Sequence, residues 1–318
     1  MKQKKPRILA AVLLCLLAVG VLFGVYVGDY YHADTAAEAA LLSDDSVTVT
    51  QGNGSWVFAP DTPAAGLIFY PGGKVENTAY APLLHKLADK GILCVLVKMP
   101  CNPAVLGMNA ADGIPEDFPE VNSWYIGGHS LGGAMAASYA AKHTDELDGL
   151  VLLAAYSTDD LTGSRLRIYS TYGSEDGVMN REKYEADRSN LPANTTEVVI
   201  DGGCHAGFGS YGPQAGDGTP TISGEDQQQQ TADALAAWMI QQAKVMQLFL
   251  AASLFCFNFS FSKNPHSFIG IAFSVLFHCL LYRKHITLST NSFSVAASAG
   301  GKRAASTAAI TVTSLVVA

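Results

Sequence analysis

Ser130 lies at the centre of a glycine-rich segment, Gly-Gly-His-Ser-Leu-Gly-Gly, which spans residues 127–133. The segment fits the pattern G-x-S-x-G, with Gly128 and Gly132 placed two residues before and after the serine. A strand-like segment precedes it and a run of small residues of helical character follows it, which is the setting of a sharp turn that exposes a serine hydroxyl. The residues therefore predict that Ser130 is a nucleophile and that Gly128, His129 and Gly132 form the turn. The alternative is a polar residue in an ordinary glycine-rich turn.

A nucleophilic serine needs a general base, and histidine commonly fills this role. Of the eight histidines, His205 stands out because it lies in a glycine-rich loop directly after a strand-like segment. The others lie in the N-terminal segment, in or near helices, in the turn around Ser130 or in the C-terminal tail: His32, His85, His143, His129, His266, His278 and His285. The side chain of His129 is expected to point away from that of Ser130. We therefore predict His205 as the base, and the alternative is a surface histidine.

Three carboxylates are candidates for orienting the histidine. Asp176 follows the strand-like segment 165–173 and precedes a glycine. Glu175 is its direct neighbour, and Asp201 lies at the end of a strand, from which it would have to reach backward. A carboxylate at any of these positions is able to hold an imidazole in the tautomer that a base needs. The glycine at 177 favours Asp176 over the other two, and the family resemblance described next favours it as well.

Residues 47–244 resemble the α/β-hydrolase family, and most of all its small single-domain members such as dienelactone hydrolase. The resemblance rests on the G-x-S-x-G pattern and on the chain order Ser130, Asp176, His205, with the acid and the histidine each after a later strand. It implies that Ser130 attacks an acyl carbon, that His205 takes the serine proton and that Asp176 orients the imidazole.

The developing negative charge on a substrate oxygen needs two backbone donors. The first is the N–H of Leu131, the residue after the nucleophile. The resemblance implies that the second comes from the segment Tyr-Pro-Gly-Gly-Lys-Val at 70–75, with Gly73 or Lys74 as the donor. The alternative for this segment is an ordinary turn at the end of a strand.

Strand-like and helix-like segments alternate along this part of the chain. Continuous apolar runs bounded by glycine or proline are typical of parallel strands that are buried on both faces. The expected strands are 47–51, 55–60, 66–73, 91–100, 124–128, 149–157, 165–173 and 196–203, and the expected helices lie near 78–90, 131–143, 180–189 and 231–244. The alternation predicts an α/β fold with a mainly parallel, doubly wound sheet. The first two strands are expected to form a hairpin.

One connection in this scheme is short. Between the expected strands 149–157 and 165–173 the chain has only Thr-Asp-Asp-Leu-Thr-Gly-Ser, residues 158–164. A crossover between parallel strands usually takes a dozen or more residues. If both strands are drawn correctly, no lid covers the serine on this side. We therefore expect an open site and small or exposed acyl substrates.

The N-terminus begins with four basic residues in positions 1–7, ahead of an uncharged run of 20 residues at 8–27. A run of this length spans a bilayer as a helix, and the basic flank is expected to remain in the cytoplasm. We therefore predict that residues 1–27 form an uncleaved, single-pass anchor and that the following domain lies outside the cytoplasm. A cleaved signal peptide is the alternative.

The rest of the chain divides by composition. Residues 28–45 are expected to form a stalk or a short helix, and residues 46–244 the α/β domain. Residues 245–318 contain no Asp or Glu and include two apolar runs, each shorter than a comfortable membrane span. A membrane-inserted hairpin and an unrelated appended sequence, such as out-of-frame translation, both fit this tail.

Charge and cysteine content exclude two further classes of protein. Residues 28–244 hold all 28 acidic residues and 11 Lys and Arg, which gives a formal charge of −17 and argues against a nucleic-acid partner. Six cysteines in a chain of 318 residues do not make a disulfide framework. Cys101 and Cys204 are expected in loops on opposite sides of the sheet, so we predict free thiols.

These features predict a membrane-anchored serine hydrolase of the carboxylesterase kind, with a small acyl or ester compound as its substrate. Chemistry by a serine, a histidine and an aspartate needs no metal and no cofactor, and we expect none. Two alternatives stay open. One is a non-catalytic module of the same fold that binds a partner at the cell surface, and the other is an acyltransferase that uses the same three residues.

Overall fold

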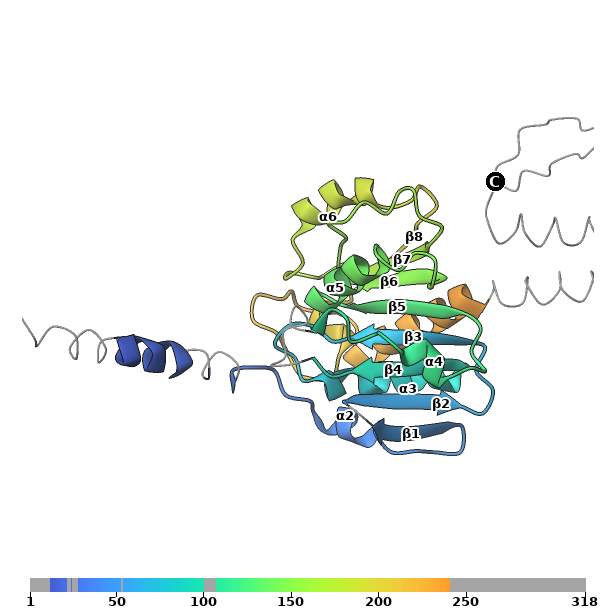
Figure 1. Ribbon diagram of the computed structural model, residues 1–318, viewed down its shortest axis with the longest axis horizontal. Helices are drawn as coiled ribbons and strands as arrows, with labels where there is room; N and C mark the ends of the chain where they lie inside the picture. Colours follow the sequence, from blue (N-terminus) through green and yellow to red (C-terminus); the bar gives the residue numbers. More distant parts are fainter. Residues whose placement is uncertain (1–11, 22–23, 25–27, 53, 100–106, 241–318) are drawn as a thin grey trace, which may run out of the picture. The chain divides into compact units, whose positions relative to one another are not determined.

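The computed structural model describes residues 12–21, 24, 28–52, 54–99 and 107–240. Eight described strands form one sheet in the order β1-β2-β4-β3-β5-β6-β7-β8 (Figure 1). They are β1 (Val47–Gly52), β2 (Ser55–Pro60), β3 (Ala65–Tyr70), β4 (Ile92–Val97), β5 (Trp124–His129), β6 (Gly149–Leu153), β7 (Arg167–Gly173) and β8 (Thr196–Ile200). The pairs β1–β2 and β2–β4 are antiparallel and the other neighbouring pairs are parallel. The predicted α/β class, the mainly parallel sheet and the first hairpin are confirmed.

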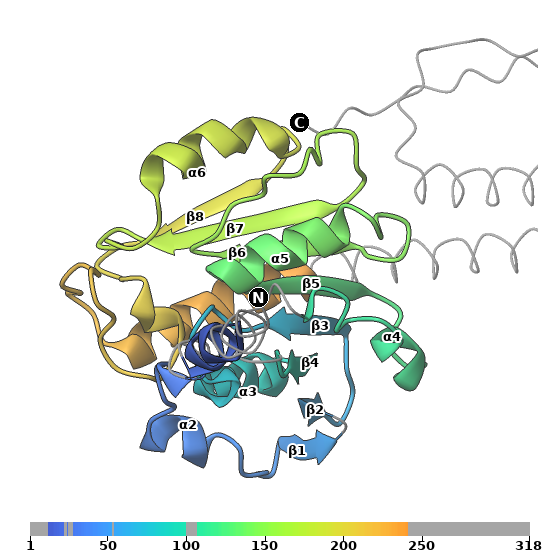
Figure 2. The same ribbon diagram turned by 60° about the vertical axis from the view of Figure 1, so that its left-hand side comes forward.

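Helices cover both faces of this sheet. Successive residues of a strand point to opposite faces, so Leu67 belongs to one core and Ile68 to the other. The helix α3 (Ala81–Asp89) and a helix at 224–240 supply side chains to the first core, whereas α5 (Leu131–Ala140) supplies the second. Figures 1 and 2 show α3 and α5 on opposite sides of the strands.

The remaining described helices are short. They are α2 (Thr35–Ala39), α4 (Ile114–Asp117) and α6 (Arg181–Asp187), with 3-10 turns at Asn77–Tyr80, Arg188–Asn190 and Ala206–Phe208. The last described helix begins at residue 224 rather than at 231 as predicted, and residues 241–244 lie outside the described part of the chain.

The direction in which the chain winds across the sheet changes between β3 and β5. From β3 the chain crosses outward to β4, and it then returns to β5 on the other side of β3. The connections that leave the carboxyl ends of β3 and β5 therefore run to opposite faces, and this is the place where open α/β sheets bind ligands. Tyr70 and Gly128 are paired at these ends. Residues 71–74 and Ser130, which follow the two strands, thus lie beside each other.

Strands β3, β4, β6 and β8 end earlier than predicted because the residues that follow them had been counted as strand. β3 ends at Tyr70 instead of residue 73, so its two glycines belong to the turn that follows. β8 ends at Ile200 instead of residue 203, and Gly202 has a φ of 73°, which is outside the extended region.

The connection between β6 and β7 is longer than the sequence suggested. β6 ends at Leu153 because Ala154 adopts a φ of 48° and leaves the extended conformation. The connection therefore runs over residues 154–166, which form turns and bends and bury Leu161 and Leu166 against the sheet. The apparent shortage of residues came from drawing both strands too long. The connection holds no helical lid.

The segment 28–45, predicted as a stalk or a short helix, contains the short helix α2 and packs against the domain. Its helix α2 is capped by Asp34 and buries Ala37. Ahead of that helix, Tyr31 forms a parallel bridge with Val75, and its N–H donates to the carbonyl oxygen of Lys74 at 2.8 Å. The segment is therefore attached to the turn that follows β3.

Residues 12–21 are helical. Among the residues that the structure describes, no helix combines the length and the apolar character needed to cross a membrane. The predicted anchor at 8–27 falls partly outside these residues, since 8–11, 22–23 and 25–27 are not described. The predicted tail at 245–318 lies outside them entirely.

The described cysteines are free thiols, as predicted. Cys94 and Cys204 are buried and Cys15 is exposed. Cys101, Cys256 and Cys279 lie outside the described residues.

Candidate active site

Ser130 connects β5 to α5 in a strained backbone conformation. Its φ is 53° and its ψ is −123°, which side-chain-bearing residues rarely adopt. The backbone N–H of Ser130 donates to the carbonyl oxygen of Leu153 at 2.9 Å, and its carbonyl oxygen accepts from Ala134 at 3.1 Å. The serine is thus held at the carboxyl end of β5, with its side chain half-buried.

Glycine is required on both sides of this turn. A Cβ atom at Gly128 would lie 2.5 Å from the carbonyl oxygen of Tyr70, and one at Gly132 would overlap the carbonyl oxygens of Tyr70 and Pro71. The two glycines let the end of β3 approach the turn, and this approach brings the segment after β3 next to Ser130.

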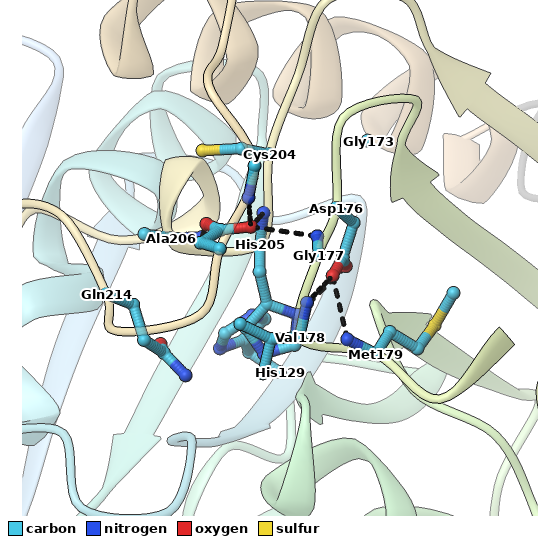
Figure 3. A network of polar contacts seen from close by, with 12 residues as sticks. His129, Gly173, Asp176, Gly177, Val178, Met179, Cys204, His205, Ala206 and Gln214 are labelled. Carbon is cyan, nitrogen blue, oxygen red and sulfur yellow. Dashed lines mark hydrogen bonds and ion pairs between the residues drawn. The ribbon is translucent and has the colours of Figure 1, made fainter.

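His205 and Asp176 form a buried pair. The Nδ1 atom of His205 lies 2.8 Å from Oδ2 of Asp176. The exposed fraction of the side chain is 1% for His205 and 0% for Asp176. The other carboxylate oxygen, Oδ1, accepts hydrogen bonds from the N–H groups of Val178 at 2.9 Å and Met179 at 2.8 Å (Figure 3). Of the three carboxylates considered from the sequence, Asp176 is therefore the one bonded to the imidazole. Glu175 and Asp201 are exposed.

This pairing determines which nitrogen of His205 is available as a base. A carboxylate only accepts, so the neutral ring carries its hydrogen on Nδ1 and leaves a lone pair on Nε2. The Nε2 atom is buried and has no hydrogen-bond partner among the described residues, which include Ser130. The structure therefore brings His205 and Asp176 together but does not join His205 to the serine hydroxyl by a hydrogen bond. Catalytic hydrogen bonds are often long without substrate and tighten in the complex.

His129, predicted as part of the turn and not as the base, lies at the same place. Its ring packs against the ring of His205, with centroids 4.5 Å apart, and so places the His205 imidazole beside the residue that precedes Ser130. The Nδ1 atom of His129 lies 2.8 Å from the hydroxyl of Tyr80, which itself accepts from the N–H of Gly72 at 3.1 Å. The Tyr80 hydroxyl therefore contacts both His129 and the turn after β3. The chain of contacts connects the end of β5 to the turn after β3.

The pKa of His129 is held well below its ordinary value of 6.5 by burial and then by the neighbouring His205. The backbone of His205 offsets part of this effect. His129 is consequently neutral at neutral pH. A neutral ring beside His205 does not repel the positive charge that His205 gains when it accepts a proton.

The lowered pKa of His129 makes the stability depend on pH. On acidification below about 6.5, the unfolded chain binds a proton at His129 before the folded protein does, so the free energy of unfolding falls by about 1.4 kcal/mol per pH unit until the folded pKa is reached. His129→Gln is expected to flatten the curve of unfolding free energy against pH in this window. Urea unfolding between pH 7 and pH 5 measures it. His32 is exposed, so the control variant His32→Gln is expected to follow the wild-type curve. An unchanged slope in His129→Gln would contradict the prediction.

The two backbone segments predicted to bind an oxyanion are in contact. Leu131 is the first residue of α5, and the first N–H groups of a helix lack partners within it. A Cβ atom at Gly73 would lie 2.9 Å from a side-chain carbon of Leu131, so the turn after β3 touches the start of α5. Lys74 has a φ of 58°, and its ammonium pairs with Asp29 at 2.8 Å. The positive end of the α5 dipole also faces this region.

Two residues at the site were not singled out from the sequence. Tyr80 falls in the expected helix near 78–90, and the signal available there is that a tyrosine hydroxyl requires a partner when it is buried. Asp217 accepts backbone hydrogen bonds from the loops of Asp176 and His205. It lies in a glycine-rich loop, and its sequence surroundings give no sign of this role.

Comparisons with known proteins bear on the family of the chain. A family model described as the alpha/beta hydrolase family matches residues 66–229. No curated protein matches the chain significantly.

Several solved structures are similar. One is a CIB-like hydrolase from Thermoplasma acidophilum, at 16% identity and a TM-score of 0.44, with 60% of this chain and 97% of that chain covered. Another is the esterase domain of a Rhodothermus marinus protein, at 14% identity and a TM-score of 0.45, with coverages of 62% and 98%. A third is an S-formylglutathione hydrolase from Agrobacterium tumefaciens, at 11% identity and a TM-score of 0.45, with coverages of 61% and 94%.

Proposed function

The chain belongs to the alpha/beta hydrolase family, and from this premise we propose that it is a serine hydrolase that cleaves a small carboxylic ester or related acyl compound. Ser130 is the proposed nucleophile, His205 the general base and acid, and Asp176 the residue that orients the imidazole. The N–H groups of Leu131 and of Gly73 or Lys74 are the proposed donors to the oxyanion.

The proposed reaction proceeds through an acyl-enzyme. Nε2 of His205 accepts the hydroxyl proton of Ser130 while Oγ bonds to the acyl carbon, and the carbonyl electron pair moves to the oxygen. The two N–H donors stabilise this oxyanion. Its collapse breaks the ester bond, and the leaving alcohol takes the proton from His205. Water then attacks the acyl group with His205 as base, which releases the acid and restores Ser130.

The observation that carries this proposal is the state of His205. One ring nitrogen is fixed by Asp176 at 2.8 Å, while the other is buried beside the turn that holds Ser130 and has no partner in the part of the chain that the structure describes. A buried polar atom without a hydrogen bond costs about 1 to 3 kcal/mol, so such atoms call for an explanation. An imidazole nitrogen that must be free to take a proton from a serine supplies one.

Labelling with a fluorophosphonate tests the proposal on the full chain. The folded protein is expected to form a covalent adduct at Ser130, located by mass spectrometry of its peptides. Heat-denatured protein and Ser130→Ala should give no adduct, and Ser138→Ala, which removes another hydroxyl of α5, should label like the wild type. A folded wild-type protein without an adduct would instead favour a non-catalytic binding module.

The substrate is expected to carry a small or exposed acyl group. The connection 154–166 after β6 contains no helical lid, which supports an open site on that side. The rate of hydrolysis is therefore expected to fall along the series of p-nitrophenyl acetate, butyrate, octanoate and laurate. A maximum at laurate would contradict this. An added alcohol that captures the acyl group in place of water would identify an acyltransferase.

We also propose that residues 8–27 anchor the protein in a membrane, with the hydrolase domain outside the cytoplasm. The support is the uncharged run of 20 residues behind a basic start, together with exposed apolar side chains such as Leu14 and Leu17 in the described part of the run. Deletion of residues 1–27 is expected to move the protein from the carbonate-resistant membrane fraction to the soluble fraction. A full-length protein found in the soluble fraction would refute the anchor, and a mature N-terminus beyond residue 27 would identify a cleaved signal peptide.

A further inference from the structure

Asp217 binds four backbone N–H groups with one carboxylate. Its Oδ1 atom accepts from Gly177 at 3.1 Å, from His205 at 3.1 Å and from Gly218 at 2.9 Å. Its Oδ2 atom accepts from Ala206 at 2.8 Å. No catalytic step described above uses this carboxylate.

Three of the four donors come from two loops that are distant in sequence, and the fourth, Gly218, is the residue after Asp217. Gly177 follows Asp176 in the loop after β7, whereas His205 and Ala206 lie in the loop after β8. Figure 3 shows these loops next to each other, with Asp176 and Gly177 on one and His205 and Ala206 on the other. The carboxylate of Asp217 therefore ties the loop that carries the acid to the loop that carries the imidazole.

The loop of Asp217 is also packed tightly against the acid loop. A Cβ atom at Gly218 would overlap the carbonyl oxygen of Glu175, the residue before Asp176. Burial raises the pKa of Asp217, but the N–H groups of Ala206, Gly177 and His205 lower it by more, and the net pKa lies below the ordinary value. The carboxylate is thus ionised at neutral pH, and its hydrogen bonds are charge-assisted.

We propose that Asp217 is a positioning residue that holds Asp176 and His205 at bonding distance and directs the imidazole toward Ser130. The inference rests on the proposed serine hydrolase function. Asp217 acts through the loops, since its described contacts are with their N–H groups and with the side chain of Cys204, and not with the reacting atoms. The bond between the Asp176 and His205 side chains joins the ends of two separate loops, so its length depends on how those loops are held together.

The substitution Asp217→Asn changes this arrangement with little change in volume. Asparagine keeps one acceptor oxygen, which is able to serve the three donors at Oδ1. Its NH2 group then takes the place of Oδ2 and faces the N–H of Ala206, so that two hydrogen-bond donors meet. The loop of His205 is expected to shift in response. A misplacement of about 1 Å is enough to lower a rate by about 10²-fold. Substrate affinity is expected to remain, because Asp217 is not part of the proposed oxyanion site.

The test compares steady-state kinetics of full-length variants with a p-nitrophenyl ester. D217N is expected to lower kcat by roughly 10- to 10²-fold and to leave KM nearly unchanged. Asp148→Asn is the matched control, because Asp148 accepts from the N–H of Trp124 at 3.0 Å, at the opposite end of β5 from Ser130. D148N is expected to keep the wild-type kcat even if it lowers the urea midpoint.

A folded D217N with wild-type kcat, or a loss of kcat equal to that of D148N, would overturn the inference. If D217N does not fold, the same comparison is made with Asp217→Glu, which retains both oxygens and displaces them by one methylene, and the same two outcomes decide. Failure of the proposed function is recognised separately, because the wild-type protein would then form no fluorophosphonate adduct at Ser130.

Discussion

Replacement of Ser130 by alanine is expected to lower kcat/KM for a p-nitrophenyl ester by about 10⁴- to 10⁶-fold. The hydroxyl is the proposed group that bonds to the acyl carbon, and alanine offers nothing in its place. The residual rate would come from the oxyanion donors and from substrate binding alone. Steady-state kinetics with enough enzyme to measure slow turnover gives the ratio.

The loss in Ser130→Ala is expected to be chemical and not structural. Serine and alanine both carry a Cβ atom, so both bear the strain of a φ of 53° at this position. The free energy of unfolding should therefore stay within about 0.5 kcal/mol of the wild type. Ser138 lies in α5, and its hydroxyl donates to Asp159 at 2.6 Å. Ser138→Ala removes that hydroxyl and should keep normal kinetics. A Ser130→Ala protein with more than about one per cent of wild-type activity would require another nucleophile.

The turn around Ser130 could be predicted from the sequence because its causes are local. A strand, a serine flanked by glycines and a helix of small residues follow one another within a short stretch, and the structure contains them at 124–129, 130 and 131–140. The parallel sheet could be predicted for a related reason, since strands buried on both faces are continuously apolar. Patterns of this kind need no knowledge of distant contacts.

The ends of strands were harder to predict because apolar residues continue into turns. Ala154 and Ala155 extend the apolar run of β6, yet Ala154 has a φ of 48° and ends the strand. Nothing in an alanine signals a positive φ. The predicted connection between the two strands was therefore too short. The observed connection between β6 and β7 runs over residues 154–166 and contains no helix.

The polar contacts around the site were not predictable because they join distant residues. Tyr80 and His129 are 49 positions apart, and Gly177 and Asp217 are 40 positions apart. These pairs depend on how the loops after β3, β7 and β8 fold over the end of the sheet. For the same reason, the docking of Tyr31 on the turn after β3 could not be deduced from a segment that read as a stalk.

Asp176→Asn is expected to lower kcat by about 10⁴-fold, and the contacts of Asp176 give the reason. Asparagine has one acceptor oxygen, and the N–H groups of Val178 and Met179 at 2.9 and 2.8 Å both require an acceptor at the Oδ1 position. The amide nitrogen must then occupy the Oδ2 position and donate to Nδ1 of His205. The imidazole is thereby driven to the tautomer with its hydrogen on Nε2, which leaves no lone pair to accept the proton of Ser130.

Two neighbouring carboxylates supply the controls that make this prediction specific. Glu175→Gln and Asp201→Asn alter the two other acids that the sequence offered as partners of the imidazole, and both are exposed. Neither change should move the tautomer, so kcat should remain at the wild-type level in both. Nitrogen-15 NMR of the histidine rings is expected to show the His205 tautomer exchanged in Asp176→Asn alone. Normal kcat in Asp176→Asn, or a comparable loss in Glu175→Gln, would contradict the prediction. It would mean that the 2.8 Å bond between Asp176 and His205 does not determine which nitrogen of His205 is free to act as the base.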